Sequence, residues 1–208
     1  MQYIDSTTRK PLLDFPITYS GTRVNIDADQ YFDLDANGRI KTFTGYFDAD
    51  TSAQRVIINY SFNSAGYLEK AAYSVPSAPS VVQYEVIYTW TNGNLTRVVS
   101  SAVGNLQKDQ IDYEYDVTKT VKENVCLFPN FEIYYVQSAI NYGKNSSNIP
   151  IKSTITTYNA AGTIEQTEVA TFTNYVIDPQ NYVKSFELKG KGTLFFTETR
   201  WVLSYHCY

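Results

Sequence analysis

The sequence predicts an all-β fold: a long antiparallel meander of repeated hairpins, curled as a single sheet around its aromatic face, with one short helix. A barrel or a two-sheet sandwich is the alternative, because large open sheets tend to close or split. Composition is the first observation behind this prediction. The chain has 19 Tyr, 11 Phe and 2 Trp among 208 residues, and aromatic side chains fit a half-buried, pleated surface. Repeated glycine turns and alternating apolar residues are the other two observations.

Glycine turns recur along the chain at similar spacing. The clearest copies begin "FDLDANGRI", "YSFNSAGYL", "YTWTNGNL" and "TTYNAAGTI", with their glycines at Gly38, Gly66, Gly93 and Gly162. The first two intervals are 28 and 27 residues, and each copy has an aliphatic residue two positions after its glycine. A period near 28 that contains two strands and two turns predicts hairpin repeats over about residues 30–120. Closing hairpins are expected over 150–208.

Two further segments resemble copies without the glycine, "YEYDVTKTV" from Tyr113 and "YVIDPQNYV" from Tyr175. The strands themselves show apolar residues at alternate positions, as in the run Tyr84, Val86, Tyr88 and Trp90. This period of two predicts strands with one buried face, and their short connections require antiparallel pairing. "SVPSAPS" (74–80) contains two prolines and is expected to be a loop.

One segment departs from the strand pattern. In "PNFEIYYVQSAINYGK" aromatic and small residues recur at helical spacing, with Asn130 as N-cap and Gly143 as the stop, which predicts a helix over 130–142. Its β-branched and tyrosine content leaves a strand as the alternative. "NSSNIP" (145–150) is expected to be a loop that returns the chain to the sheet. No flexible linker divides the chain, so residues 1–208 are expected to form one domain.

The stretch "FDLDANGRI" has two interpretations. Asp33, Asp35, Asn37 and Gly38 match the first half of an EF-hand calcium loop, but Thr44 stands where that loop needs a bidentate carboxylate. The other copies keep the glycine and lose the acids, which is what a hairpin turn requires. We therefore predict a hairpin turn and no metal site. A calcium site would have to recruit nearby acids, namely Asp27, Asp29, Asp48 and Asp50.

The glycine hairpins resemble YD-type repeats. The stretch "YGKNSSNIPIKSTITTYNAAGTIEQT" is similar to the late portion of a Bacteroidota family of secreted or lipid-anchored β-proteins of unknown function. In that family a helix-like segment, an Asn-x-Pro loop and a closing hairpin follow one another. The matching positions here are 130–142, Asn148 to Pro150, and Tyr158 to Gly162, within a resemblance that covers about residues 30–175. The resemblance implies a β-rich envelope protein and carries no catalytic residues.

No constellation of residues predicts an enzyme or a cofactor. His206 is the only histidine, and its neighbour Cys207 points to the opposite face of a strand, so the two do not form a catalytic pair. Cys126 and Cys207 lack metal-binding spacing and are read as free buried thiols, with a disulfide as the alternative. We expect a non-catalytic binding or structural module of the cell envelope that recognises a glycan or a protein through exposed Tyr and Trp. The rival is a hydrolase with an unrecognised Asp/Glu pair.

Charge and composition bound the partners and the compartment. The net charge is −4 and basic residues form no cluster, which excludes a nucleic-acid footprint. No window is apolar enough for a transmembrane helix, and we expect a monomer. Met1 is the only methionine, which suits a start codon added after a removed leader. Together with the resemblance this predicts the periplasm or the cell surface. The cytoplasm is the alternative, because the first residues lack a secretory signal.

Overall fold

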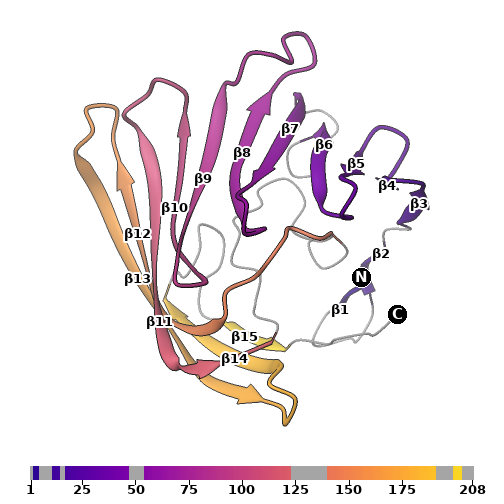
Figure 1. Cartoon of the computed structure of the whole chain (residues 1–208). Coiled ribbons are helices and arrows are strands. Elements are labelled where there is room, and N and C mark those ends of the chain that lie inside the picture. Colours follow the sequence, from indigo (N-terminus) through magenta and orange to yellow (C-terminus); the bar gives the residue numbers. More distant parts are fainter. Residues whose placement is uncertain are drawn as a thin grey trace. The chain divides into compact units, whose positions relative to one another are not determined.

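In the computed structural model, all regular structure of the described residues is β-strand, and no helix occurs among them (Figure 1). Residues 17–46, 54–122 and 140–190 are described with their side chains. For three further strands only the backbone is described: β1 (Gln2–Ile4), β2 (Pro11–Asp14) and β15 (Thr199–Val202). The all-β prediction is confirmed. None of the described segments is a helix long and apolar enough to cross a membrane.

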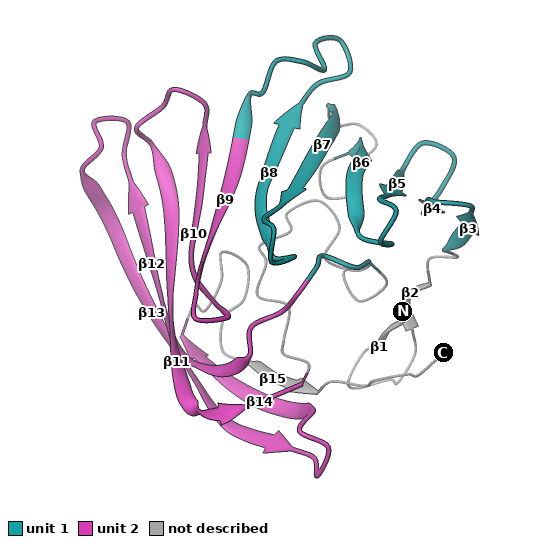
Figure 2. Cartoon of the chain, viewed as in Figure 1, with its two compact units in different colours: residues 1–84, 130–143 teal, residues 85–129, 144–208 magenta. Residues whose placement is uncertain are grey.

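The chain divides into two compact units (Figure 2). Unit 1 comprises residues 1–84 and 130–143, and unit 2 comprises residues 85–129 and 144–208. Besides β1 and β2, unit 1 holds β3 (Thr18–Ser20), β4 (Arg23–Asn25), β5 (Tyr31–Leu34), β6 (Ile40–Tyr46), β7 (Arg55–Phe62) and β8 (Leu68–Ser74). Unit 2 holds β15 and, before it, β9 (Tyr84–Thr91, whose first residue falls in unit 1), β10 (Asn94–Ala102), β11 (Lys108–Thr120), β12 (Asn148–Tyr158), β13 (Ile164–Ile177) and β14 (Val183–Gly190).

Strand order follows chain order throughout the main sheet. The thirteen strands β3 to β15 form one sheet in sequence order, and β1 pairs with β2 in a separate two-stranded sheet. The pairings are antiparallel, for example Phe32 with Phe43 between β5 and β6, and Val98 with Ile111 between β10 and β11. The strands β3 and β15 stand at opposite ends of this order, so the sheet is not closed. The predicted antiparallel meander is confirmed.

Four hairpins share one turn geometry. They span Asp35–Gly38, Asn63–Gly66, Asn159–Gly162 and Asp178–Asn181. In each, the amide of the first residue donates to the carbonyl of the fifth, and the amide of the fourth donates to the carbonyl of the first, at 2.7–3.0 Å. The fourth residue has a φ of 68–90°, which glycine and asparagine tolerate best. This is a type I turn followed by a left-handed residue, and it confirms the hairpin interpretation of "FDLDANGRI".

The remaining copies of the repeat behave differently from one another. "YVIDPQNYV" is a true copy, because Asn181 takes the left-handed position of the missing glycine. The Gly93 copy forms a tighter two-residue turn with Asn92 and Gly93 at φ values of 52° and 78°. The prediction for "YEYDVTKTV" is wrong. This segment lies inside β11, where Asp116 bonds the amide of Thr118 at an irregularity of the strand and the chain does not reverse.

The core of unit 1 is a row of apolar side chains across five strands. Directly opposed residues in β4 to β8 are all buried: Val24, Phe32, Phe43, Ile58 and Tyr73. The rings of Phe32 and Phe43 lie 5.1 Å apart. Because side chains alternate between faces, one register aligns this whole row on one face.

The core of unit 2 is built in the same way. Val98, Ile111 and Ile155 oppose one another across β10, β11 and β12, and all three are buried. Phe172 of β13 opposes Leu188 of β14, and both are buried. The predicted burial of one face of β9 is confirmed at Val86 and Tyr88.

Two predictions concern the chain between β11 and β12. Residues 130–139 of the predicted helix lie outside the described residues, and its last residues, Ile140 to Tyr142, are not helical. The loop prediction for "NSSNIP" is wrong for its second half, because Asn148 begins β12. Pro150 is tolerated there because the register with β11 shifts beside it. The expected loop at 74–80 is confirmed, since β8 ends at Ser74.

Candidate functional site

The acids of the proposed calcium loop serve the hairpin. One carboxylate oxygen of Asp35 accepts hydrogen bonds from the amides of Asn37 and Arg39 at 2.8 and 2.9 Å. The other accepts from the Arg39 guanidinium at 2.8–2.9 Å. Desolvation raises the pKa of Asp35, but these hydrogen bonds outweigh it and hold the pKa below its ordinary value. Asp35 is thus a charged turn residue with both oxygens engaged.

Asp33 faces a different set of partners. Its carboxylate receives two bonds from Arg23 of β4, directly opposite, at 2.8 and 3.1 Å, and one from Thr42 of β6 at 3.3 Å. Arg23 also lies over the ring of Tyr31 at 3.8 Å. This arrangement is a cross-strand ion pair. Within residues 17–46, 54–122 and 140–190, no three His, Cys, Asp or Glu side chains are grouped for a metal ion.

The other acids considered for calcium do not complete such a site in the described residues. Asp27 accepts from the amides of Asp29 and Gln30 at 2.8 Å and from the side chain of Gln30 at 2.7 Å. It caps the connection between β4 and β5. Asp48 and Asp50 lie outside the described residues, as do His206, Cys126 and Cys207.

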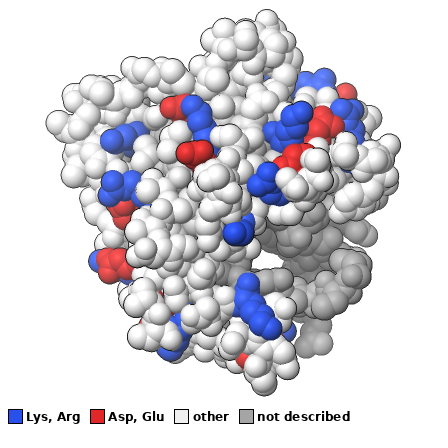
Figure 3. Space-filling view, viewed as in Figure 1, with Lys and Arg blue, Asp and Glu red and all other residues white. Residues whose placement is uncertain are grey.

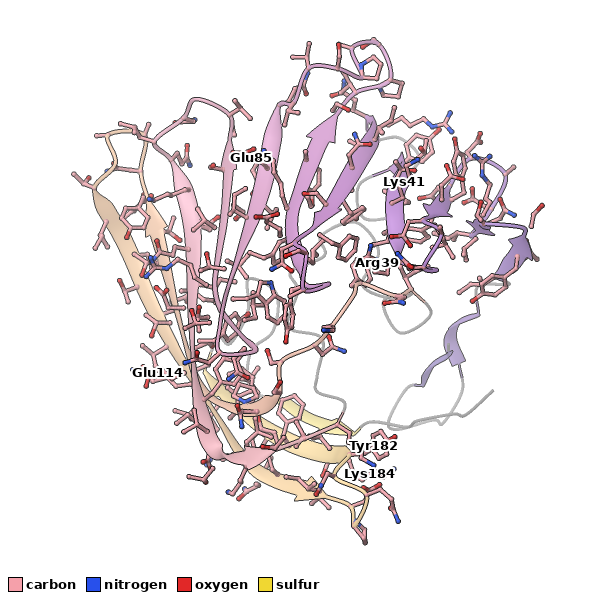
Figure 4. The ribbon with its side chains drawn as sticks, viewed as in Figure 1. Arg39, Lys41, Glu85, Glu114, Tyr182 and Lys184 are labelled. Carbon is pink, nitrogen blue, oxygen red and sulfur yellow. The ribbon has the colours of Figure 1, made fainter. Side chains whose placement is uncertain are left out.

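Several carboxylates of unit 2 also form ion pairs. These pairs are Arg97 with Asp112, Lys152 with Glu114, Lys119 with Asp116, and Lys184 with Asp178. Figure 4 places Glu114 on β11, and Lys184 beside Tyr182 on the strand that follows the Asp178 turn. Charges of both signs are interspersed on the face shown in Figure 3. Such pairs favour solubility and strand register.

The pKa values of the turn acids argue against general acid catalysis by these groups. A hydrogen bond from Thr118 lowers the pKa of Asp116. A bond from the Tyr182 amide lowers the pKa of Asp178, against a smaller opposing effect of desolvation. With Asp35, these are the described carboxyl groups whose pKa clearly departs from the ordinary value. A general acid at neutral pH needs a raised carboxyl pKa, and all three are shifted the other way.

Unit 2 contains a buried polar cluster that sequence reasoning missed, defined here as Asn94, Tyr115, Ser146 and Asn148. The Asn94 side chain donates to the side chain of Asn148 at 2.9 Å and accepts from its amide at 3.0 Å. Asn148 also donates to the carbonyls of Val117 and Lys119. The two asparagines are therefore paired in both directions although 54 residues separate them in the chain. The one local signal was asparagine at each end of a turn-rich segment, which does not reveal its partner.

The rest of the polar cluster joins the same two segments. Ser146 accepts from the amide of Leu95 at 3.0 Å, and its hydroxyl lies 3.0 Å from that of Tyr115. Tyr115 donates to the Leu95 carbonyl at 2.8 Å. Burial raises the pKa of Tyr115 well above its ordinary value, so its hydroxyl stays protonated. Each of these polar groups has partners, and the cluster holds residues 146–148 against β10.

The described aromatic side chains mostly pack inside each unit. Tyr19 on β3 is the one described aromatic residue with a mostly exposed side chain, at 65%. Trp90 is half-buried, and the side chain of Trp201 lies outside the described residues. Tyr175 stacks on Phe186 at 5.5 Å and donates to the carbonyl of Pro150 at 2.6 Å. The described surface therefore offers no row of exposed rings for stacking on a sugar.

Solved structures similar to this chain are porin-like proteins of Bacteroides. A porin-like protein from Bacteroides vulgatus ATCC 8482 matches 99% of this chain and 91% of its own, with a TM-score of 0.58 and 14% identity. One from Bacteroides uniformis ATCC 8492 matches 89% and 72%, with a TM-score of 0.54 and 12% identity. No protein-family model matches the sequence. No curated protein matches it either. The likeness shows a shared β-fold.

Proposed function

We propose that the protein is a non-catalytic β-sheet module of the cell envelope, exported to the periplasm or the cell surface, where it binds a protein partner or serves a structural role. The observation that carries the proposal is the likeness to a porin-like protein over 99% of the chain. That title belongs to the neighbour, and at 14% identity it supports the compartment by analogy of fold.

The chemistry of the described residues supports the non-catalytic part. The acids with displaced pKa values are turn residues or ion-pair partners, and the buried hydroxyls of Tyr115 and Tyr175 have hydrogen-bond partners. A hydrolase of the rival class needs two convergent carboxyl groups, one with a raised pKa. Ion-paired carboxylates on an alternating sheet face suit a rigid scaffold instead.

Cell fractionation tests the compartment. The tagged full-length protein, expressed in its source organism, is expected in the envelope fraction, and partition into detergent would reveal a lipid anchor. Accessibility to protease in intact cells separates the surface from the periplasm. Recovery in the cytosol would overturn the envelope proposal.

Catalysis is tested separately on the purified protein with panels of glycoside and ester substrates. No turnover above that of the heat-denatured protein is expected. Turnover that disappears after one Asp→Asn or Glu→Gln substitution would overturn the non-catalytic part of the proposal.

A further inference from the structure

The first part of β13 extends beyond its neighbour β14. β13 pairs with β12 from Ile164 onward, but its described pairing with β14 ends where Ala170 meets Gly190. Gly190 has a φ of 87°, and a side chain there would collide with the carbonyl oxygen of Val169. The backbone of β14 therefore leaves the register of a regular strand at this point. Among the described residues, none pairs with the second edge of residues 164–169.

Exposure supports an open edge at this position. Residues 164–167 are all exposed, with Ile164 at 62%, and Val169 is exposed as well. On the adjoining stretch of β12, Ile155 and Thr156 are buried. A strand with neighbours on both sides is shielded in this way, whereas an edge strand is not.

The four equivalent hairpins provide an internal comparison. The aliphatic residue two positions after the left-handed residue is buried in three of them: Ile40, Leu68 and Val183. In two of these three, chain from outside the hairpin lies close by: the amide of Ile40 donates to the carbonyl of Asn141 at 2.9 Å, and Gly143 bridges Tyr67, next to Leu68. In the fourth hairpin the corresponding residue is the exposed Ile164. The local sequence is the same kind of turn, and what differs is the covering chain.

The sequence of this edge lacks the usual protections against strand addition. Natural edges are blunted by lysine, proline or a bulge, and "IEQTEV" (164–169) contains neither of those residues. Its described register with β12 runs without a shift from Gln166 to Thr171. It carries two glutamates and no basic residue, so its formal charge is −2. Glu165 is fully on the surface, since its residue is exposed.

We propose that residues 164–169, the β13 edge, bind an extended peptide segment of a protein partner. The peptide adds to the sheet as an antiparallel strand, with backbone hydrogen bonds to the alternate N–H and C=O groups of the edge. A basic side chain of the peptide lies opposite Glu165, and apolar side chains lie opposite Ile164 and Val169. The inference deepens the proposed function, because it names the partner class of the binding module.

Charge favours a basic partner over a second copy of this chain. In a self-paired edge, two segments with a charge of −2 each would meet, and like charges near one another across strands are unfavourable. A partner strand with two basic residues neutralises the edge instead. The antiparallel sequence that matches the edge is apolar, basic, any, any, basic, apolar.

A titration with the acetylated, amidated peptide Val-Lys-Thr-Thr-Lys-Val tests this inference on the full-length, isotope-labelled protein. We expect chemical-shift changes and slowed amide exchange confined to residues 164–169 and their immediate neighbours. Binding is expected to weaken as salt rises. Two peptides N-methylated on alternate residues discriminate strand addition from simple charge attraction. Strand addition requires that methylation of one set abolishes binding while methylation of the other is tolerated.

The matched variants are Glu165→Lys and, as control, Glu69→Lys, which makes the same charge change on an exposed residue of β8 in unit 1. We expect Glu165→Lys to raise the dissociation constant about two- to fivefold and Glu69→Lys to leave it unchanged. No shift at 164–169, equal loss in both variants, or equal binding of both methylated peptides would overturn the proposal.

Self-association is an alternative outcome with its own signature. A dimer in sedimentation that protects the amides of 164–169, without peptide binding, would assign the edge to a second copy and overturn the proposal. The peptide experiment is independent of cell fractionation. Failure of the peptide leaves an envelope location standing, and a cytosolic location leaves peptide binding standing.

Discussion

At the scale of single residues, the hairpins depend on two positions of each turn. The first residue is Asp or Asn, and its side chain accepts from the amides two and four positions on: Asp35, Asn63, Asn159 and Asp178. The fourth is a glycine or an asparagine with positive φ. Asn and Asp are interchangeable as acceptors in this role, so the chain itself suggests matched substitutions.

Replacement of Asp35 by alanine is expected to lower the free energy of unfolding by about 1–2 kcal/mol, because two turn amides lose their acceptor. Asp35→Asn keeps that acceptor and loses only the partly exposed ion pair with Arg39, so a loss of at most about 1 kcal/mol is expected. Urea unfolding of the three proteins measures both. Equal losses would show that the side-chain acceptor does not hold the turn.

Gly143 provides a second test at this scale. Its φ is 86°, and an added Cβ would lie 2.5 Å from the carbonyl oxygen of Gly66. Gly143→Ala is expected to cost at least about 2 kcal/mol, because backbone strain adds to a collision with main chain. Gly104→Ala is the control, since Gly104 has a φ of 80° with open space around it. A cost of about 1 kcal/mol is expected there, and equal costs would contradict the close approach.

At the scale of elements, unit 2 joins the start of β12 to β10 through buried amides. Asn148 and Asn94 bond each other in both directions, and the amide of Ser147 donates to the carbonyl of Gly93 at 3.0 Å. The Ser147 carbonyl accepts from the amide of Val121 at 2.9 Å. Buried polar groups are costly unless paired. The position of β12 is therefore fixed by polar partners as well as by its apolar face.

Asn148→Ala is expected to lower the free energy of unfolding by about 2–3 kcal/mol, because it leaves Asn94 and two β11 carbonyls without a partner. Asn94→Ala is expected to have a similar effect, and the double variant to lose less than the sum. Asn145→Ala, at an exposed neighbouring position, should change stability by no more than about 0.5 kcal/mol. Additive losses in the double variant would contradict direct pairing.

At the scale of the whole molecule, acids and tyrosines limit stability at opposite ends of the pH range. The lowered pKa values of Asp35, Asp116 and Asp178 mean that their charged forms stabilise the folded chain. The raised pKa values of Tyr115 and Tyr175 mean that their neutral forms do. The chain should therefore be most stable between these two ranges.

On the acid side, stability from lowered carboxyl pKa values is fully present above the unfolded value of about 4 and is lost as pH falls through the folded value. The melting temperature is expected to hold between about pH 7 and 5 and to fall below about pH 4. Asp178→Asn should flatten this fall, because Asn63 and Asn159 show that an amide holds the same turn. An unchanged acid profile in this variant would contradict the assigned pKa direction.

On the alkaline side, the sign is reversed. Stability from the buried tyrosines is fully present below the unfolded pKa of about 10 and is lost as pH rises above it. Tyrosinate absorbance should therefore show some tyrosines that ionise only when the chain unfolds. Tyr115→Phe is expected to cost about 1 kcal/mol at neutral pH, through its lost bonds, and to weaken the alkaline loss. Ionisation of every tyrosine in the folded protein would contradict the buried hydroxyls.

The sequence by itself determined the β class, the antiparallel order and most of the turns. These features rest on rules that act over a few residues: a period of two, an Asx acceptor, and a residue that tolerates positive φ. Asp35 and Gly38 could be assigned to a hairpin because the sister turns kept the same two functions without the acids. For the same reason Asn181 was within reach, as the residue type that replaces glycine at positive φ.

Only the tertiary structure decided which residues the local patterns would bury or pair. Ile40 and Ile164 follow the same kind of turn, yet one is buried and the other exposed, because covering chain reaches only the first. Asn148 pairs with Asn94 across 54 residues, and no local pattern specifies a partner at that distance. The segment at Tyr113 has the aromatic spacing of a hairpin but continues as β11, because pairing with β10 and β12 outweighs a weak turn preference. Burial and polar pairing depend on segments that meet only in the folded chain.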